Sequence, residues 1–181
     1  MRACSSYSLL RLPKWYPMAE YRRRLVIEGR PLPVVVNGDE VGLQLACGEY
    51  TVLATNFDYF EGCHHWIYLL GRNGRPVDQL SMPDQFGFIQ EVAVVSPNEV
   101  VLGYFGTNDR WNLVVRDGGF WSYDPRSLLR RPNRFLLAKR RLEVKRTKGA
   151  PWSLPSAPNP SIEGTASGGL RPPSTAPHVK R

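Results

Sequence analysis

The sequence predicts an all-β protein, an antiparallel meander of about eight to ten short strands forming a sandwich, a barrel or a partial propeller. Short runs of aromatic and β-branched residues alternate with tight glycine turns along most of the chain. A motif of an aromatic residue, a short apolar run and a glycine turn recurs at an interval of 45 residues. No stretch of about ten residues or more has the 3.6-residue period of an amphipathic helix.

The strongest copy of this motif spans residues 66–77, with Asn73-Gly74 at its turn. Trp111 begins the downstream copy, which has an Asp117-Gly118 turn, and a fainter upstream copy begins at Tyr21. Asn, Asp and Gly tolerate the positive φ that tight hairpin turns require. We therefore expect hairpins arranged as blade-like pseudo-repeats. Because so few repeats cannot close a propeller, the open sheet edges predict a sandwich or a homo-oligomer that pairs its edges.

Turn residues divide the chain into further expected strands, at residues 21–36, 41–45, 49–55, 89–95, 99–105, 110–116 and 120–123. Residues 135–138 and 142–144 are expected to form one last strand or two short ones. Pro31 and Pro33 lack the N–H group that a central strand needs, so residues 21–36 are expected at a sheet edge or in a loop. Residues 56–65 and 83–87 are expected as loops.

Three parts are expected along the chain. Residues 1–17, interrupted by Pro13 and Pro17, are predicted to be a flexible N-terminal extension. Residues 18–148 form the all-β domain. Residues 149–181 are rich in Pro, Ser and Gly and are predicted to be disordered, because they cannot bury enough apolar surface to offset the entropy of ordering.

The last 23 residues contain NPSIEGT at 159–165, GLRPP at 169–173 and APHVKR at 176–181. These segments resemble the translation of an integron attachment site, the recombination element at the end of mobile gene cassettes. The resemblance implies a bacterial protein encoded on a mobile element, with a tail shaped by DNA recombination. It implies nothing about the fold or chemistry of residues 18–148, in which no family is recognised.

Hydrophobic residues make up 42% of the chain, but no apolar run approaches the roughly 20 residues of a membrane helix. The three cysteines, at irregular spacings, do not suggest a disulfide framework. We therefore expect a cytoplasmic protein with reduced thiols and no membrane partner.

Charge is distributed unevenly along the chain. Residues 25–125 hold thirteen acidic against five basic residues, whereas residues 126–148 hold ten basic against one acidic. The basic segment could contact a nucleic-acid backbone through four arginines, namely Arg130, Arg131, Arg140 and Arg141. It could instead protect a strand edge, cover the acidic body of its own chain or meet an acidic protein partner. We favour self-complementation or an acidic partner, because the body carries a net charge of −8.

Cys63, His64 and His65, near Asp58 and Glu61, form the densest cluster of potential metal ligands. Neighbouring residues of a strand point to opposite faces, so at most two of these side chains could converge. We therefore expect no metal site and no cofactor. A small metal-dependent or hydrolytic enzyme centred on residues 63–65 remains the alternative.

Phe57, Tyr59, Phe60 and Phe86 are large for loop residues, and we predict that they contact a partner or ligand. The leading hypothesis is a non-catalytic binding protein that engages a protein or a small molecule through these side chains. Because gene cassettes often carry small adaptive proteins, the resemblance adds an immunity or antitoxin role as one form of this hypothesis. Nucleic-acid binding through the basic segment is the first alternative.

Overall fold

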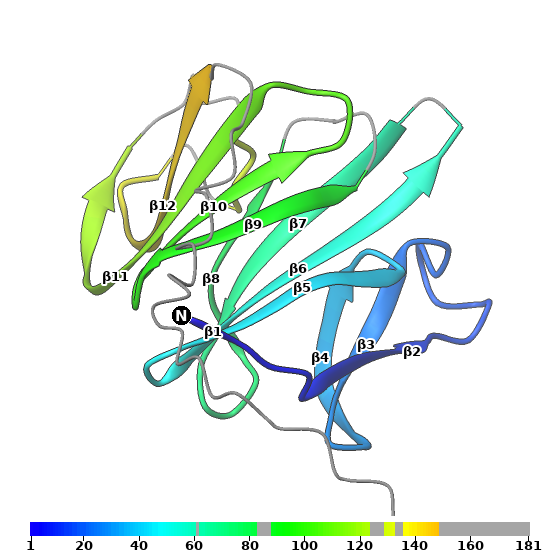
Figure 1. The fold of residues 1–181 in the computed structure, drawn as a ribbon. Helices are drawn as coiled ribbons and strands as arrows, with labels where there is room; N and C mark the ends of the chain where they lie inside the picture. Colours follow the sequence, from blue (N-terminus) through cyan, green and yellow to red (C-terminus); the bar gives the residue numbers. More distant parts are fainter. Residues whose placement is uncertain (61, 83–87, 124–128, 133–135, 149–181) are drawn as a thin grey trace, which may run out of the picture.

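The computed structural model is all-β and contains three antiparallel sheets built from twelve strands (Figure 1). It describes residues 1–60, 62–82, 88–123, 129–132 and 136–148. Within these ranges each sheet is open, with a strand at either edge, and no helix is long and apolar enough to span a bilayer. The all-β prediction is confirmed, and the strands exceed the expected number because two lie in the N-terminal segment.

The central sheet has the strand order β1-β5-β6-β7-β8 and consists of β1 (Arg2–Ala3), β5 (Glu40–Cys47), β6 (Tyr50–Tyr59), β7 (Gly62–Leu70) and β8 (Pro76–Ser81). The small sheet, in the order β2-β3-β4, consists of β2 (Tyr7–Arg11), β3 (Arg22–Ile27) and β4 (Arg30–Asn37). The outer sheet, in the order β12-β11-β10-β9, consists of β9 (Ile89–Ser96), β10 (Glu99–Tyr104), β11 (Asp109–Ser122) and β12 (Ala138–Lys148).

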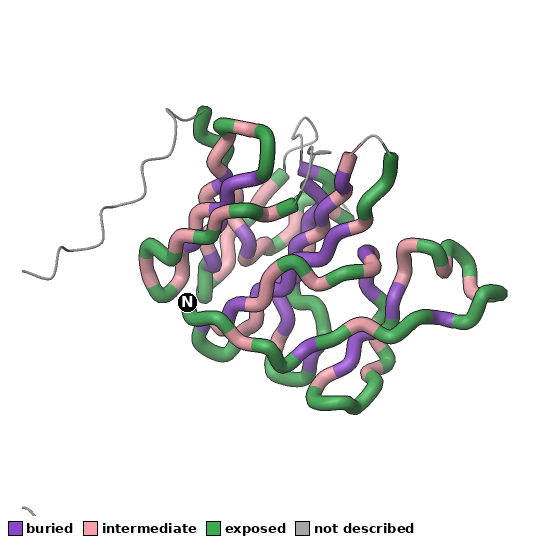
Figure 2. The backbone as a smooth tube through the Cα atoms, turned by 45° about the vertical axis from the view of Figure 1, so that its right-hand side comes forward, coloured by how far each residue is buried: buried purple, intermediate pink, exposed green. Residues whose placement is uncertain are grey.

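The central sheet is buried on both faces, so the molecule has three layers. On β7, Ile67 and Leu69 pack into a first core against the outer sheet, whereas Tyr68 and Leu70 pack into a second core against the small sheet. Successive side chains of a strand point to opposite faces, so a strand between two cores needs apolar residues at consecutive positions. The central strands accordingly carry long buried stretches (Figure 2).

Contrary to the predicted flexible extension, residues 2–3 and 7–11 form strands in two different sheets. Tyr7 is buried in the second core, with Leu9 packed against it. The amide of Gln44 accepts a hydrogen bond from the Tyr7 N–H at 2.9 Å and donates one to the Tyr7 carbonyl at 2.7 Å. Core burial and this two-way bond hold the segment in place.

Two turn and loop predictions are wrong for related reasons. Asp117-Gly118 does not end a hairpin, because β11 continues to Ser122 and pairs with β12 on both sides of a bulge between Val115 and Phe120. The expected loop at residues 56–65 is instead the end of β6 and the start of β7, paired up to Tyr59. In both places the strands stay paired across a segment expected to be a turn or a loop.

Other local predictions are confirmed. The Asn73-Gly74 turn joins β7 to β8, with Gly74 at a φ of +72° and its N–H donating to the Gly71 carbonyl at 2.8 Å. β4, which contains Pro31 and Pro33, is an edge strand. The missing proline N–H groups therefore leave no gap inside the sheet.

The turn glycine Gly38 lies where the small and central sheets come close together, and the turn glycine Gly48, within the central sheet, serves as a comparison. Gly38 has a φ of +101°, and a Cβ there would lie 2.6 Å from the Cβ of Thr55, whereas Gly48 has a φ of +59° with no atom within 4 Å of such a Cβ. We expect Gly48→Ala to lower the free energy of unfolding by about 1–2 kcal/mol through backbone strain. Gly38→Ala should cost about 1–3 kcal/mol more because of the added clash. Urea denaturation of both variants checks this, and equal losses would contradict the close approach.

Candidate functional site

Four exposed aromatic side chains, Tyr59, Phe60, Phe88 and Phe105, define what we call the aromatic end. Tyr59 and Phe60 lie at the tip of the β6–β7 hairpin, and Phe60 is 105% exposed. Phe88 and Phe105 are each more than half exposed, and their rings stack with centroids 5.7 Å apart. Such a concentration of exposed rings is unusual unless a surface is used for binding.

Contacts between the sheets place these residues at one end of the sandwich. The N–H of Phe105 donates to the Phe88 carbonyl at 3.0 Å, which joins the start of β9 to the end of β10. The ring of His65, near the start of β7, lies 4.7 Å from that of Tyr104, the last residue of β10. The β6–β7 tip and the β9–β10 ends therefore lie at the same, upper end in Figure 1.

The structure keeps part of the predicted aromatic set. Tyr59 and Phe60 are exposed as expected, but Phe57 is half-buried, with the ring of Tyr21 edge-on at 6.0 Å. Phe86 lies outside the described residues. Sequence reasoning missed the pairing of Phe88 with Phe105, which depends on strand ends 17 residues apart. The available signal was that Phe88 directly precedes the expected strand at residues 89–95 and that Phe105 ends the expected strand at residues 99–105.

The Cys63–His65 cluster lies on β7 rather than in a loop. Cys63 and His65 are buried, whereas His64 points to the other face and its ring lies 4.4 Å from that of Trp66. Among the described residues, no group of three or more His, Cys, Asp or Glu side chains is placed to hold a metal ion. Burial, together with a hydrogen bond to Asp58, raises the pKa of the Cys63 thiol to about 12. Such a thiol stays protonated at neutral pH, which makes it a poor nucleophile.

A histidine–serine pair occurs on the opposite face of β7. His64 Nε2 lies 2.7 Å from Ser81 Oγ, at hydrogen-bond distance. Acyl transfer would also need free N–H donors beside the serine to stabilise the oxyanion. The Ser81 N–H donates to the Arg130 carbonyl at 2.6 Å, and the Met82 N–H donates to the His65 carbonyl at 2.9 Å. Both neighbouring donors are already used, so the pair is better suited to shaping a surface than to catalysis.

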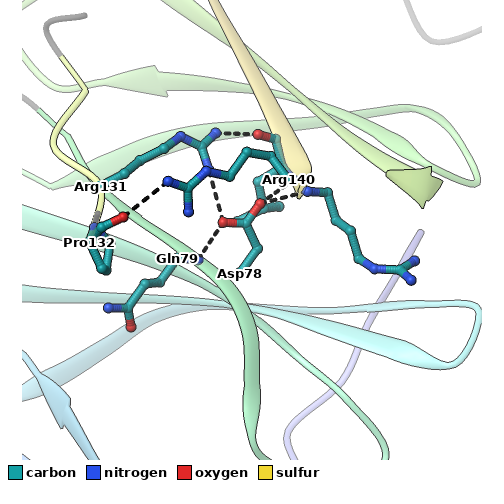
Figure 3. Close-up of polar contacts among 7 residues, drawn as sticks. Asp78, Gln79, Arg131, Pro132 and Arg140 are labelled. Atoms are coloured by element: carbon teal, nitrogen blue, oxygen red, sulfur yellow. Dashed lines mark hydrogen bonds and ion pairs between the residues drawn. The ribbon is translucent and has the colours of Figure 1, made fainter. Parts of the chain in front are cut away.

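Among the residues that the structure describes, Asp78 accepts more hydrogen bonds than any other acidic side chain, and Figure 3 shows its surroundings. Its Oδ1 accepts from the Gln79 N–H at 2.8 Å and from Arg131 Nη1 at 2.9 Å. Its Oδ2 accepts from the N–H groups of Arg141 at 2.7 Å and Leu142 at 2.8 Å. The carboxylate is 1% exposed, so four donors replace its lost hydration.

We call this arrangement the Asp78 clamp, comprising Asp78, Arg131 and the backbone of residues 141 and 142. Arg131 also donates to the Leu142 carbonyl. The clamp thus joins β8, an edge of the central sheet, to β12, an edge of the outer sheet. Burial lowers the pKa of Arg131, while the charge of Asp78 opposes that shift. The side chains take the place of strand–strand hydrogen bonds where the two sheets meet.

Three of the four arginines predicted to contact nucleic acid bind groups of their own chain. Besides Arg131, Arg140 donates to the Pro132 carbonyl at 3.0 Å, as Figure 3 shows. Arg141 donates to the Asp117 carbonyl and lies 5.3 Å over the Tyr50 ring. These contacts agree with the self-complementation interpretation.

The fourth arginine, Arg130, is exposed. Arg130 is one of the residues that line a pocket of about 210 Å³ beside the Asp78 clamp. Asn37, Trp66, Tyr68 and Gln79 also line this pocket. It is smaller than the roughly 300–1,000 Å³ typical of drug-sized sites, so it suits a small molecule.

No protein-family model, curated protein or solved structure matches the chain.

The shifted pKa of Cys63 predicts sensitivity to alkali. The unfolded thiol ionises near its ordinary pKa of 9.0, whereas the folded thiol keeps its proton to about 12. The unfolded state therefore releases this proton first, and stability falls as the pH rises through this window. We expect the stability advantage of wild type over Cys63→Ala to shrink as the pH rises from about 9 toward about 12.

Urea denaturation at several pH values measures this difference. Cys4→Ala is the matched control, because Cys4 is only partly buried. A difference between wild type and Cys63→Ala that is independent of pH would show that the Cys63 environment is not as described.

Proposed function

We propose that the chain is a non-catalytic binding protein that docks a protein partner through its aromatic end. The observation that carries this proposal is Phe60, a fully exposed phenylalanine at a hairpin tip, in a region with three further exposed aromatic rings. Aromatic side chains are enriched among the residues that dominate binding energy at protein interfaces.

Energetics and shape support a protein as the partner. Burying one such aromatic side chain stabilises a complex by about 1.5–3 kcal/mol, so several rings together could anchor an interface. Phe60 extends from the hairpin tip rather than into a cavity of its own chain. A partner must therefore supply the concave surface, which a protein can do and a small molecule cannot.

The arrangement of nucleophiles supports a non-catalytic role. The buried Cys63 thiol is held in its protonated form, and the backbone donors next to Ser81 are engaged. The resemblance of residues 159–181 to a translated attachment site makes an immunity or antitoxin protein of the bacterial cytoplasm one concrete form of the proposal.

A photo-crosslinking amino acid at position 60 tests the proposal in cells of the host. We expect one discrete adduct with a second protein, identified by mass spectrometry. A crosslinker at Val77, which is 46% exposed near the opposite end of the central sheet, serves as the control and should give no such adduct. Identical adducts from both positions, or none from position 60, would contradict the proposal, and an adduct with a second copy would indicate a homo-oligomer.

Purified components then test the energetic role of the aromatic end. We expect Phe60→Ser and Phe105→Ser each to weaken the complex by roughly tenfold or more, as loss of an anchor residue does. Phe60 is fully exposed, so Phe60→Ser should change the free energy of unfolding by less than about 0.5 kcal/mol, whereas Phe105→Ser should lower it by about 0.5–1.5 kcal/mol because the stack with Phe88 is lost. Calorimetry measures binding and urea denaturation measures stability. Unchanged affinity in both variants would remove the aromatic end as the interface.

A further inference from the structure

We propose that the pocket beside the Asp78 clamp binds a small carboxylate with a flat or apolar body. The pocket lies on the face of the central sheet between the end of β4 and residues 130–132. It is separate from the aromatic end and independent of the proposed protein partner.

Three polar side chains line the pocket without a partner. Within the described part of the chain, the side chains of Asn37, Gln79 and Arg130 make no hydrogen bond or ion pair, although all three border the same space. The backbone at these positions is fixed, since the Asn37 N–H donates to Tyr68 Oη at 2.8 Å and residue 130 pairs with Ser81. Two amides and a guanidinium on a rigid frame are suited to a ligand with several oxygen atoms.

The surroundings of the pocket are positively charged. The guanidinium groups of Arg130, Arg131 and Arg140 lie in this region. Asp78 is the acidic side chain of the clamp, and its negative charge is paired with Arg131. Arg131 is committed to Asp78, which leaves the exposed Arg130 able to form a two-pronged bond to a planar anion. An anionic ligand therefore fits better than a neutral or cationic one.

The remaining walls point to a carboxylate rather than a phosphate. Trp66 and Tyr68 supply aromatic surface, and Trp66 is held in place by Tyr21, whose ring is nearly parallel at 6.3 Å. Phosphate sites commonly use free backbone N–H groups. Here the N–H groups of Ser81 and Arg130 bond to each other's carbonyls at 2.6 and 3.0 Å. One available guanidinium, two amides and an apolar wall match a monocarboxylate with a flat body.

Calorimetric titration of the full chain tests the site with benzoate, with its neutral analogue benzamide and with inorganic phosphate. We expect saturable binding of benzoate, and weaker binding of both other probes by about tenfold or more. Arg130→Gln should weaken benzoate binding by about tenfold to a hundredfold, because a charge-assisted bond is lost. The matched control Arg75→Gln removes an exposed arginine at the β7–β8 turn and should leave affinity unchanged.

A second variant and a local signal keep the test specific. Gln79→Glu places a negative charge in the pocket and should weaken benzoate binding while leaving the aromatic end intact. Benzoate should also change tryptophan fluorescence in wild type but not in Trp66→Phe. No saturable benzoate binding, equal affinity of wild type and Arg130→Gln, or tighter binding of phosphate than of benzoate would each overturn the proposal.

Discussion

The structure depends on one buried carboxylate. Asp78 accepts four hydrogen bonds, two of them from the edge strand of the outer sheet and one from Arg131. Without these donors the buried charge would be strongly unfavourable, and without the carboxylate the N–H groups of residues 141 and 142 would lose this partner. The clamp therefore fixes how β12 meets β8, which sets the relation between the central and outer sheets.

Both proposed sites follow from this arrangement. The clamp holds Arg131 against β8, and the adjacent Arg130 pairs through its backbone with Ser81, which forms one wall of the small pocket. At the other end, the contact of His65 with Tyr104 brings the central and outer sheets together beneath the exposed rings. The molecule thus has a polar, positively charged site on the face of the central sheet toward the small sheet, and an apolar site at the end where the central and outer sheets meet.

Much of the fold could be predicted from local sequence, because glycine turns and β-branched runs act over a few residues. Asn73-Gly74 and the edge position of Pro31 and Pro33 are examples. The third layer was harder to predict, since the consecutive apolar residues of β7 show burial on two faces but not which strands cover each face. Tyr7 illustrates the difficulty, because its burial depends on distant Gln44 and on the small sheet.

The candidate sites were less accessible from sequence. Tyr59 and Phe60 could be identified as exposed aromatics, but grouping them with Phe88 and Phe105 requires the sheet topology. The partner of Asp78 lies 53 residues away, and the sequence does not distinguish Asp78 from the other acids of the body. The charge asymmetry between the body and the basic segment did favour internal pairing, but it could not assign individual pairs.

The free energies of unfolding of Asp78→Asn, Arg131→Met and the double variant measure how far the fold depends on the Asp78 clamp. We expect Asp78→Asn to lower the free energy of unfolding by about 3–5 kcal/mol, because a buried pair is broken. We also expect a coupling between the two positions of at least about 1 kcal/mol. Asp109→Asn is the matched control, since Asp109 pairs with the more exposed Arg146, and it should cost less than about 1 kcal/mol. Equal losses for Asp78→Asn and Asp109→Asn, without coupling to Arg131, would show that the fold does not depend on the Asp78 clamp.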